Sequence, residues 1–296
     1  MSIRTGVPAD TFRAWERRYG VPKPHRTQDS HRLYSERDVA AINWLKEQTD
    51  SGIAIRQAAA LLKASVEKPP VTSLQIESPE EASSLLLTAL VGLDTPRAER
   101  LLEACIARFG VETTCISVIQ PMLYRIGIHW AEGTVPVSVE HFSSYFIRTR
   151  LAALIDLHQR EEGELGPVVT ACAPGEQHEI GLLMLNLFLL RRGVRVIHLG
   201  ADLPLGELVE VAVRMRPRVI CLSASTQENA RSLVESVREI EKMDGALPHM
   251  SCGGYAFRTY PELRAQVEDL WLGSDALQAA DAICSLLADT GDELDL

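Results

Sequence analysis

The residues best suited to carry chemistry stand in one short segment, Glu176-Gln177-His178-Glu179-Ile180-Gly181, which follows an apolar run. A carboxylate two residues before an imidazole can accept a hydrogen bond from one ring nitrogen, which fixes the tautomer and leaves the other nitrogen free to ligate a metal. The glycine at 181 lets a following helix begin close to a bulky group. A lone histidine in such a place is more often structural or catalytic than a ligand, so its role depends on its surroundings.

Small residues follow this segment at two distances. Forty-one residues separate Gly181 from Ser223-Ala224-Ser225, and twenty-seven more lead to Gly253-Gly254. All three groups follow short apolar runs that are typical of buried strands. Because the carboxyl ends of parallel strands meet at one edge of a sheet, where open α/β sheets bind ligands, we expect the three groups to lie together.

This spacing resembles the cobalamin-binding domain of the methionine synthase and mutase families, whose pattern is DxHxxG, SxL and GG. Glu176 replaces the aspartate of that pattern, and Ser225 replaces its leucine. The resemblance implies that His178 is the lower ligand of the cobalt in cobalamin, oriented by Glu176. The other implied cofactor-binding residues are Gly181 and the small residues that make room for the displaced nucleotide tail, Ser223, Ser225, Gly253 and Gly254.

A different chemistry is indicated near the amino terminus. Within the stretch from Thr5 to Gly20, Phe12 and Trp15 are spaced to face a core, whereas three arginines project outward. A stiff proline-containing turn and a candidate strand at 31–34 follow. This combination suits contacts with DNA phosphates and the major groove, and the alternative interpretation is a solvated charged helix.

The string from Gly6 to Tyr34 resembles the winged helix-turn-helix head of the MerR family of transcription regulators. The resemblance implies a helix in the major groove and a wing on the DNA backbone, with contacts from Arg13, Arg17, Arg18, Tyr19, Arg32 and Tyr34. Two departures bear on DNA affinity. The glycines that precede HRLY in the family are Asp29-Ser30 here, and only four residues precede Thr5, so the first helix is expected to be almost absent.

Charge and composition agree with a regulator of this kind. Up to Ser65, eleven Lys and Arg outnumber seven Asp and Glu, whereas the remainder carries nineteen against thirty-three. A basic head on an acidic body is typical of a DNA-binding domain joined to another module. We expect no membrane partner, since no apolar run reaches about 18 residues. Six scattered cysteines indicate buried thiols in a reducing cytoplasm rather than disulfides or a zinc site.

Hydrophobic patterning, together with the resemblances above, predicts a multidomain α plus α/β protein. The MerR resemblance implies a winged helix-turn-helix head at 1–65 with a truncated first helix, and the patterning adds a linker at 66–78, a four-helix bundle at 79–160 and a Rossmann-like, flavodoxin-type domain at 166–290. Helices of the bundle are expected over 80–93, 96–109, 111–132 and 137–157. Parallel strands are expected over 167–173, 194–199, 218–223, 249–252 and 269–272, and the acidic tail at 291–296 is expected to fray.

The bundle holds Trp130 and, after nine residues, Glu140-His141. By themselves these residues fit a core tryptophan and a solvated pair. Together with the other two domains, they resemble the light-sensing CarH and LitR branch of MerR regulators. That resemblance implies a bundle that caps the upper face of adenosylcobalamin, with Trp130 and Glu140 on the deoxyadenosyl group. It further implies that Val137 and His141 are cofactor-binding residues. It also implies a homo-oligomer, dimer or tetramer, that represses at a DNA operator in the dark and releases it in light.

One departure concerns the state after illumination. The branch has a histidine directly after the tryptophan, which ligates cobalt once the adenosyl group has left, and here that residue is Ala131. His129 precedes Trp130 instead, and two residues along a helix turn by roughly 200°. We therefore expect no second histidine ligand after illumination.

Other functions compete with a photoreceptor. A corrinoid methyl-carrier module of a methyltransferase also pairs a helical bundle with this domain, but it lacks a MerR-like head. A regulator could also sense cobalamin as a metabolite, or carry a second chromophore such as a linear tetrapyrrole, without cobalt photochemistry. We find no nucleophile–base pair or acid–base pair in the sequence, so an enzyme is not expected.

Overall fold

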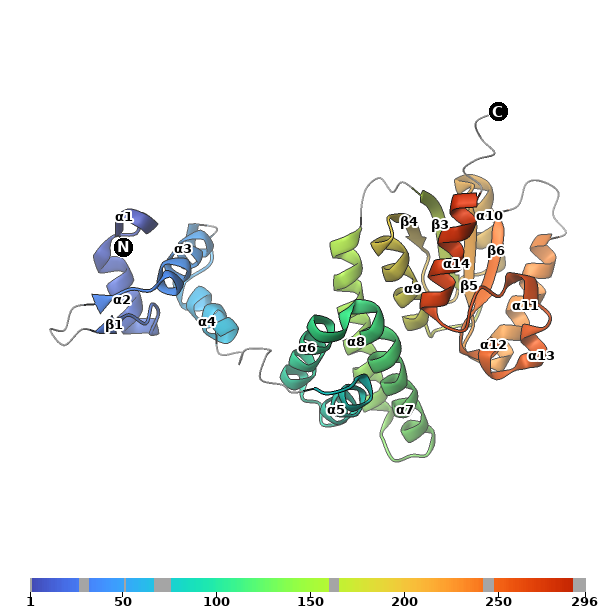
Figure 1. Ribbon diagram of the computed structural model, residues 1–296, viewed down its shortest axis with the longest axis horizontal. Coiled ribbons are helices and arrows are strands. Elements are labelled where there is room, and N and C mark those ends of the chain that lie inside the picture. Colours follow the sequence, from blue (N-terminus) through green and yellow to red (C-terminus); the bar gives the residue numbers. More distant parts are fainter. Residues whose placement is uncertain are drawn as a thin grey trace. The chain divides into compact units, whose positions relative to one another are not determined.

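The computed structural model of the protein describes residues 2–26, 32–50, 52–66, 76–159, 165–241 and 248–289 (Figure 1). The chain forms two compact units, Met1–Leu74 and Gln75–Leu296, which are treated separately below. Three expectations fall outside the described residues: the Asp29-Ser30 turn, most of the linker at 66–78, and the acidic tail. The domain boundaries drawn from the sequence stay predictions.

The first unit is small and mostly helical. Its elements are α1 Ser2–Thr5, α2 Ala9–Tyr19, β1 His25–Arg26, β2 Arg32–Leu33, α3 Glu36–Asp50 and α4 Ile55–Val66. Helix α1 is a single turn of four residues. Strands β1 and β2 pair antiparallel, with His25 opposite Leu33, so the candidate wing is a two-stranded hairpin.

Two apolar clusters hold this unit together. Phe12 is buried with Val7 and Ile42, and Trp15 packs against them from α2. A second cluster joins α3 and α4 around Leu45. The predicted inward positions of α2 therefore face the core, and its arginines remain on the outside.

The second unit begins with a helical layer. Its elements are α5 Pro79–Val91, α6 Thr95–Thr113, the π-helical stretch η2 Thr114–Ile119, α7 Gln120–Ala131 and α8 Val137–His158. Ser78 and Asp94 cap α5 and α6 with side-chain oxygens that accept backbone N–H groups. The break expected between 109 and 111 is a kink at Gly110, whose φ of +81° allows α6 to continue into η2 and α7.

An α/β layer completes the unit. Its elements are β3 Leu165–Cys172, α9 Ile180–Arg191, β4 Val194–His198, α10 Leu205–Met215, β5 Val219–Ser223, α11 Gln227–Glu241, β6 His249–Gly253, α12 Tyr255–Thr259, α13 Pro261–Arg264, η3 Glu268–Leu270 and α14 Ala276–Asp289. The strands are parallel in the order β4-β3-β5-β6. Helices α9 and α14 pack together on one face, and α10 and α11 share the core of the other.

The prediction of a fifth strand at 269–272 is wrong. Residues Glu268–Leu270 form a 3-10 turn, and Trp271 makes a single parallel bridge to Cys252. The Trp271 ring packs against Phe257 at 6.3 Å between centroids. Side-chain packing therefore holds this segment beside β6, and it adds no further ladder to the sheet.

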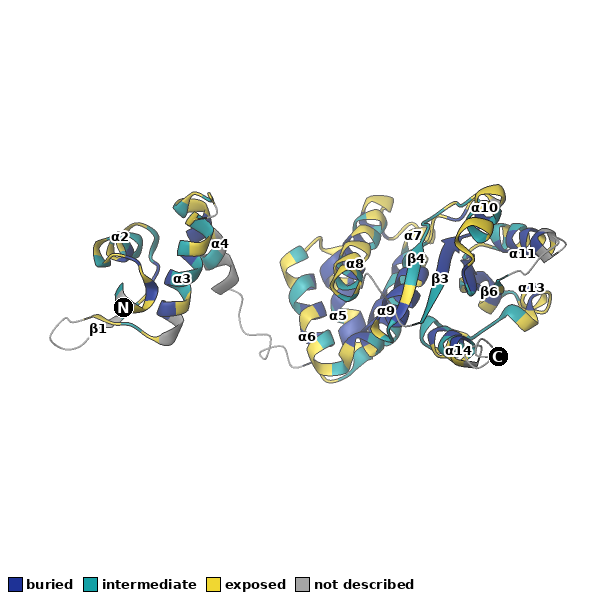
Figure 2. Ribbon diagram, turned by 90° about the horizontal axis from the view of Figure 1, so that it is seen from above, coloured by how far each residue is buried: buried dark blue, intermediate teal, exposed yellow. Residues whose placement is uncertain are grey.

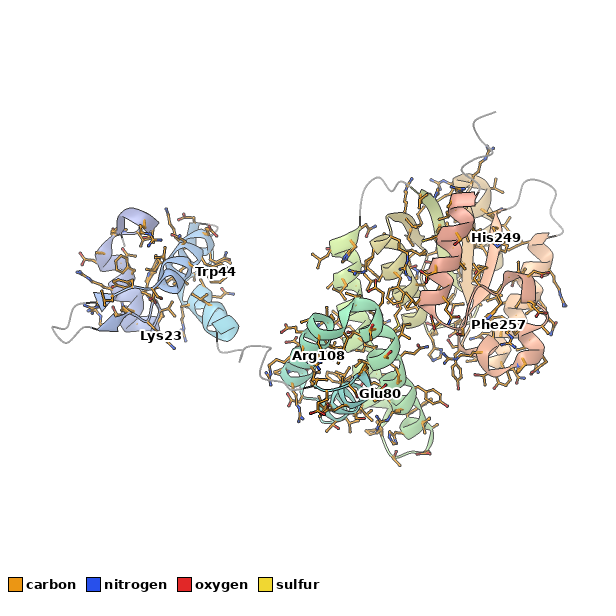
Figure 3. All side chains as sticks on the ribbon, viewed as in Figure 1. Lys23, Trp44, Glu80, Arg108, His249 and Phe257 are labelled. Carbon is orange, nitrogen blue, oxygen red and sulfur yellow. The ribbon has the colours of Figure 1, made fainter. Side chains whose placement is uncertain are left out.

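Helix α9 lies between the two layers. Nine consecutive residues, Leu182 to Leu190, are buried, as expected for a helix that is covered on all sides. Helix α8 of the bundle packs along it, and the sheet and α14 cover the rest (Figure 2). In Figure 3, His249 marks the start of β6 and Phe257 lies beyond its carboxyl end, where the predicted site residues gather.

All six cysteines are free, and five of them are buried. Among the described residues, no helix is both long and apolar enough to cross a membrane.

Candidate functional site

Three predicted groups share the carboxyl edge of the sheet. In the register of the strands, Cys172 at the end of β3 lies beside Ser223 of β5, and Ser223 lies beside Gly253 of β6. The turn that carries Glu176 and His178 rises directly from Cys172. The parallel topology thus brings together residues that are separated by more than seventy positions in the chain.

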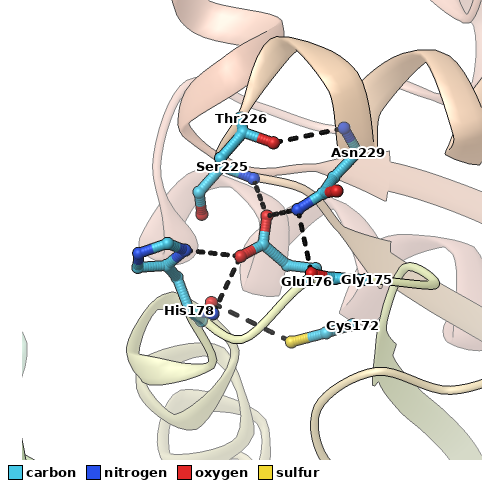
Figure 4. A network of polar contacts seen from close by, with 7 residues as sticks. All are labelled: Cys172, Gly175, Glu176, His178, Ser225, Thr226 and Asn229. Carbon is cyan, nitrogen blue, oxygen red and sulfur yellow. Dashed lines mark hydrogen bonds and ion pairs between the residues drawn. The ribbon is translucent and has the colours of Figure 1, made fainter.

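Glu176 is the centre of a hydrogen-bond network (Figure 4). Its side chain is fully buried. Oε1 accepts hydrogen bonds from the backbone N–H of His178 at 2.8 Å and from the ring Nδ1 at 2.6 Å. Oε2 accepts from the Ser225 N–H at 2.5 Å and from Asn229 Nδ2 at 3.2 Å. Both carboxylate oxygens are therefore satisfied from the turn itself and from the segment after β5.

The turn is also fixed through its backbone. Gly175, at φ +78°, donates its N–H to Asp202 Oδ1 at 2.7 Å, and the Asp202 N–H donates to the Glu176 carbonyl at 2.9 Å. Asn229 donates to the Gly175 carbonyl at 3.3 Å. Segments that follow β4 and β5 thus hold the turn from two sides.

These contacts set the charges of the pair. Burial alone would raise the pKa of Glu176, but the hydrogen bonds described above outweigh it and lower the pKa to about 2. The hydrogen bond to Glu176 raises the pKa of His178; burial lowers it, and the charges of Glu176 and Glu140 raise it further. An ionised Glu176 therefore holds a proton on Nδ1, which leaves Nε2 of the neutral ring as the ligating nitrogen.

Open space lies next to the turn that carries His178. The His178 side chain is 68% exposed although its partner Glu176 is fully buried. A Cβ placed on Gly181 or Gly253 would meet no atom within 4 Å. Gly254 differs, because at φ +107° its Cβ would lie 2.2 Å from the Ala224 carbonyl, so glycine is needed there for the close approach to β5.

The donor set fits cobalamin better than a bare metal ion. Among the described residues, no three His, Cys, Asp or Glu side chains are grouped as a protein-only metal site. A corrin supplies four equatorial nitrogens of its own, so it needs only one protein ligand. A single exposed imidazole on a rigid buried carboxylate, with open space at two glycines, meets that need.

The bundle contributes a second carboxylate. Glu140 accepts hydrogen bonds from Ser144 Oγ at 2.8 Å and from His141 Nδ1 at 2.6 Å. It is close enough for its charge to raise the pKa of His178. Trp130 and Val137 are about half exposed at the adjoining ends of α7 and α8. The structure thus places Glu140 near His178, bonded to His141 and Ser144 on its own helix.

His129 is turned toward its own loop. Its Nδ1 lies 3.3 Å from Thr134 Oγ1 and 3.9 Å from the Glu132 carboxylate. The expectation that His129 does not replace the histidine ligand missing at Ala131 stays a prediction.

The candidate DNA-contact residues of the head fall into two groups. Arg13, Arg17 and Arg18 are exposed on α2. Arg32 donates to Glu16 at 2.8 Å, so it is tied to α2. The aromatic candidates serve the core: Tyr19 packs against the Leu45 cluster, while the Tyr34 ring meets Phe12 edge-on at 5.4 Å with its hydroxyl buried.

Sequence reasoning missed three residues of the site. Asn229 and Asp202 hold the histidine turn, and Ser144 holds Glu140. Asn229 had a visible signal, because it follows Thr226 by three residues at the start of a helix beyond β5, where polar side chains reach the carboxyl edge.

Known proteins share this arrangement. Residues 166–281 and residues 84–155 each match a family described as B12 binding domain, and residues 1–65 match MerR HTH family regulatory protein. Over 290 residues the chain is 33% identical to the HTH-type transcriptional repressor CarH of Myxococcus xanthus, covering 96% of this chain and 90% of that protein. The chain belongs to the CarH family of B12-binding MerR-type transcriptional regulators.

Two further relatives place this family membership in context. The HTH-type transcriptional repressor CarA of Myxococcus xanthus is 33% identical over 237 residues, 78% of each chain. The monomethylamine corrinoid protein of Methanosarcina barkeri superposes with a TM-score of 0.58 at 17% identity, covering 71% of this chain and all of its own. That last likeness shows a shared fold and no more.

These findings confirm the fold class and the kind of protein expected from the sequence. A MerR-type head, a helical cap and a parallel Rossmann-like domain that binds B12 are all present. The relatives that match along the chain are transcriptional repressors, so the expectation of a regulator and not an enzyme is confirmed.

Proposed function

We propose that this regulator is a light-responsive repressor whose cofactor is adenosylcobalamin, and that His178 is the lower ligand of cobalt. The observation that carries the proposal is the buried Glu176 bonded to Nδ1 of an exposed His178, with a bundle carboxylate, Glu140, close by.

On the lower side, each residue has a defined task. Glu176 holds the proton on Nδ1 of His178 and orients the ring, while Asn229 and the Ser225 N–H hold Glu176. Ser223 and Gly253 would border the space for the nucleotide tail, since Gly253 leaves open space and Gly254 keeps the turn close to β5.

On the upper side, the bundle covers the corrin. Trp130 and Val137 would exclude water from an adenosyl group, and Glu140, held by His141 and Ser144, would accept hydrogen bonds from it. When bound, adenosylcobalamin supplies a weak cobalt–carbon bond that visible light breaks. Ala131 carries no ligating atom, and His129 faces its own loop, so no histidine of α7 takes the vacated position.

The output is DNA binding in the cytoplasm. The cofactor acts as a ligand that favours an oligomer of the chain, and several heads presented together bind an operator more tightly than one. Exposed Arg13, Arg17 and Arg18 contact the phosphates of that operator. With the adenosyl group gone, Trp130 and Glu140 would lose their contacts with it, and the oligomer and its hold on DNA would weaken.

A cobalamin sensor without cobalt photochemistry is the second candidate. Ala131 favours it, because the light product lacks the histidine ligand expected from the family resemblance. A second chromophore belongs to the same class of alternatives. The methyl-carrier alternative is set aside, because the matched repressors share the MerR-type head.

Absorption and mass, measured together, separate the two candidates. The chain is purified in the dark with adenosylcobalamin, and its spectrum and its size-exclusion mass are recorded before and after green light. The proposal predicts a spectral change and a fall in mass. An unchanged spectrum and mass in a chain that holds cobalamin would contradict the photoreceptor and support the sensor.

A further inference from the structure

Helix α8 carries polar side chains at four-residue spacing that face the histidine turn. Glu140, Ser144 and Arg148 follow one another on one side of the helix. The charge of Glu140 acts on His178, and Ser144 donates to Glu140 at 2.8 Å. One turn further along, Arg148 donates to Glu179 Oε1 at 3.2 Å. Helix α8 thus carries Glu140 and also contacts Glu179, the residue that directly follows His178.

Glu179 is a firm point of attachment. Its side chain is only 19% exposed, and its second oxygen, Oε2, lies 3.5 Å from His198 Nε2. The other ring nitrogen of His198 lies 3.0 Å from the hydroxyl of the buried Thr170 in β3. The carboxylate that Arg148 reaches therefore lies against a histidine whose other ring nitrogen contacts the sheet.

The neighbouring arginine on α8 behaves differently. Arg150 pairs with Glu99 of α6 and stacks on the Phe146 ring at 4.6 Å, so its contacts stay inside the bundle. At the other end of α9, Arg191 donates to Glu112 of the bundle at 2.9 Å. Of these polar links, the one from Arg148 is adjacent to His178.

We propose that Arg148 is a positioning residue, whose ion pair with Glu179 fixes α8 so that Glu140 stands over a cofactor ligated from below by His178. This inference rests on the proposed function. Its consequence is selective: loss of the pair weakens contacts with the upper group of the cofactor and leaves the lower ligation intact.

The test compares two cobalamins that differ only in the upper ligand. Affinities for adenosylcobalamin and aquocobalamin are measured in the dark on the full chain. With Arg148→Glu, two carboxylates face each other, and we expect affinity for adenosylcobalamin to fall about five- to tenfold, while that for aquocobalamin changes less than about twofold. The double variant Arg148→Glu with Glu179→Arg restores the pair and most of the selectivity.

Arg150→Glu is the matched control, because it makes the same charge change two residues away on the same helix. The inference predicts that this control keeps the wild-type ratio of affinities. If Arg148→Glu keeps the ratio too, if both single variants lower it equally, or if the charge swap restores nothing, the inference is overturned. A wild-type chain that binds both cobalamins equally well would overturn the proposed role of the bundle, and this inference with it.

Discussion

Glu176 shows how a single buried carboxylate can prepare a ligand. Its two oxygens accept hydrogen bonds from the backbone N–H and the ring Nδ1 of His178, from the Ser225 N–H and from Asn229, so the histidine ring is held in one orientation with Nε2 left free. A partner of a metal ligand placed in this way typically contributes 10- to 100-fold to metal affinity.

Replacement of Glu176 by Gln should therefore lower cobalamin affinity by about 10- to 100-fold. It should also change how stability depends on pH. The pKa of Glu176 is lowered from 4.5 to about 2, so its ionised form stabilises the fold above pH 4.5, and this contribution is lost as the pH falls toward 2. The raised pKa of His178 acts in the opposite sense: its contribution is full below its ordinary value of 6.5 and is lost as the pH rises through the raised value.

Thermal unfolding of the cobalamin-free chain and an NMR titration of His178 check both statements. In the variant, the acid-side loss of stability should shrink, and the pKa of His178 should return toward 6.5. Glu228→Gln, at an exposed position on α11, is the control. A raised pKa of His178 that persists without the Glu176 carboxylate would contradict this assignment.

At this scale the sequence predicts the ligand pair but not its supports. The spacing of Glu176 and His178 is local, so it is visible in the chain. Asn229 acts across fifty-three residues, and Ser144 matters through the orientation of its hydroxyl on a helix. Contacts of that kind depend on which elements become neighbours, which the local pattern does not encode.

Among the elements, the turn between β6 and α12 holds two neighbouring glycines that differ in the space available for a side chain. Gly254→Ala would place a Cβ 2.2 Å from the Ala224 carbonyl at a positive φ, and we expect it to destabilise the protein by about 1–3 kcal/mol. Gly253→Ala meets nothing within 4 Å, so the cobalamin-free protein should keep its stability. The same alanine should weaken cobalamin binding, because it fills space assigned to the nucleotide tail.

Denaturation curves and cobalamin titrations of the two variants separate these effects. The pair serves as its own control, since the substitution is the same at adjacent positions. Equal losses of stability would contradict the steric difference between the two glycines. Unaltered cobalamin binding by Gly253→Ala would show that the cofactor does not use the open space at this edge.

The elements themselves were largely predictable. Periodic apolar residues place the bundle helices and four parallel strands, and Gly110 converts an expected break into a kink. The segment at 269–272 failed because a short apolar run carries no information on pairing, and here Trp271 is held by packing against Phe257. Helix α9 is covered on all sides by α8, α14 and the sheet, an arrangement that its uniform apolar sequence indicates only in general terms.

For the molecule as a whole, the charge asymmetry separates two tasks. The basic head and the acidic remainder belong to different compact units, so substitutions of head arginines should change DNA affinity and leave cofactor affinity unaltered. Arg17→Ala and Arg18→Ala should each weaken DNA binding and lower the slope of log affinity against log salt by about one.

A salt series of DNA-binding curves tests this, with adenosylcobalamin present in the dark. Cobalamin affinity and the light-dependent change in mass should stay at their wild-type values in both variants. An unchanged salt slope would show that these arginines do not contact phosphates, and Arg13 would then be the remaining exposed candidate on α2.

The central claim concerns one bond, between His178 Nε2 and cobalt, and electron paramagnetic resonance observes it directly. The full chain is loaded with cobalamin in the cobalt(II) form, with natural and with ¹⁵N-labelled histidine. Ligation by His178 predicts a triplet splitting from the ligating nitrogen in the unlabelled protein, which becomes a doublet when histidine is labelled. The labelled His178→Ala variant should show no doublet. A splitting that remains a triplet in the labelled wild-type protein would mean that the cofactor keeps its own base, and would contradict the account.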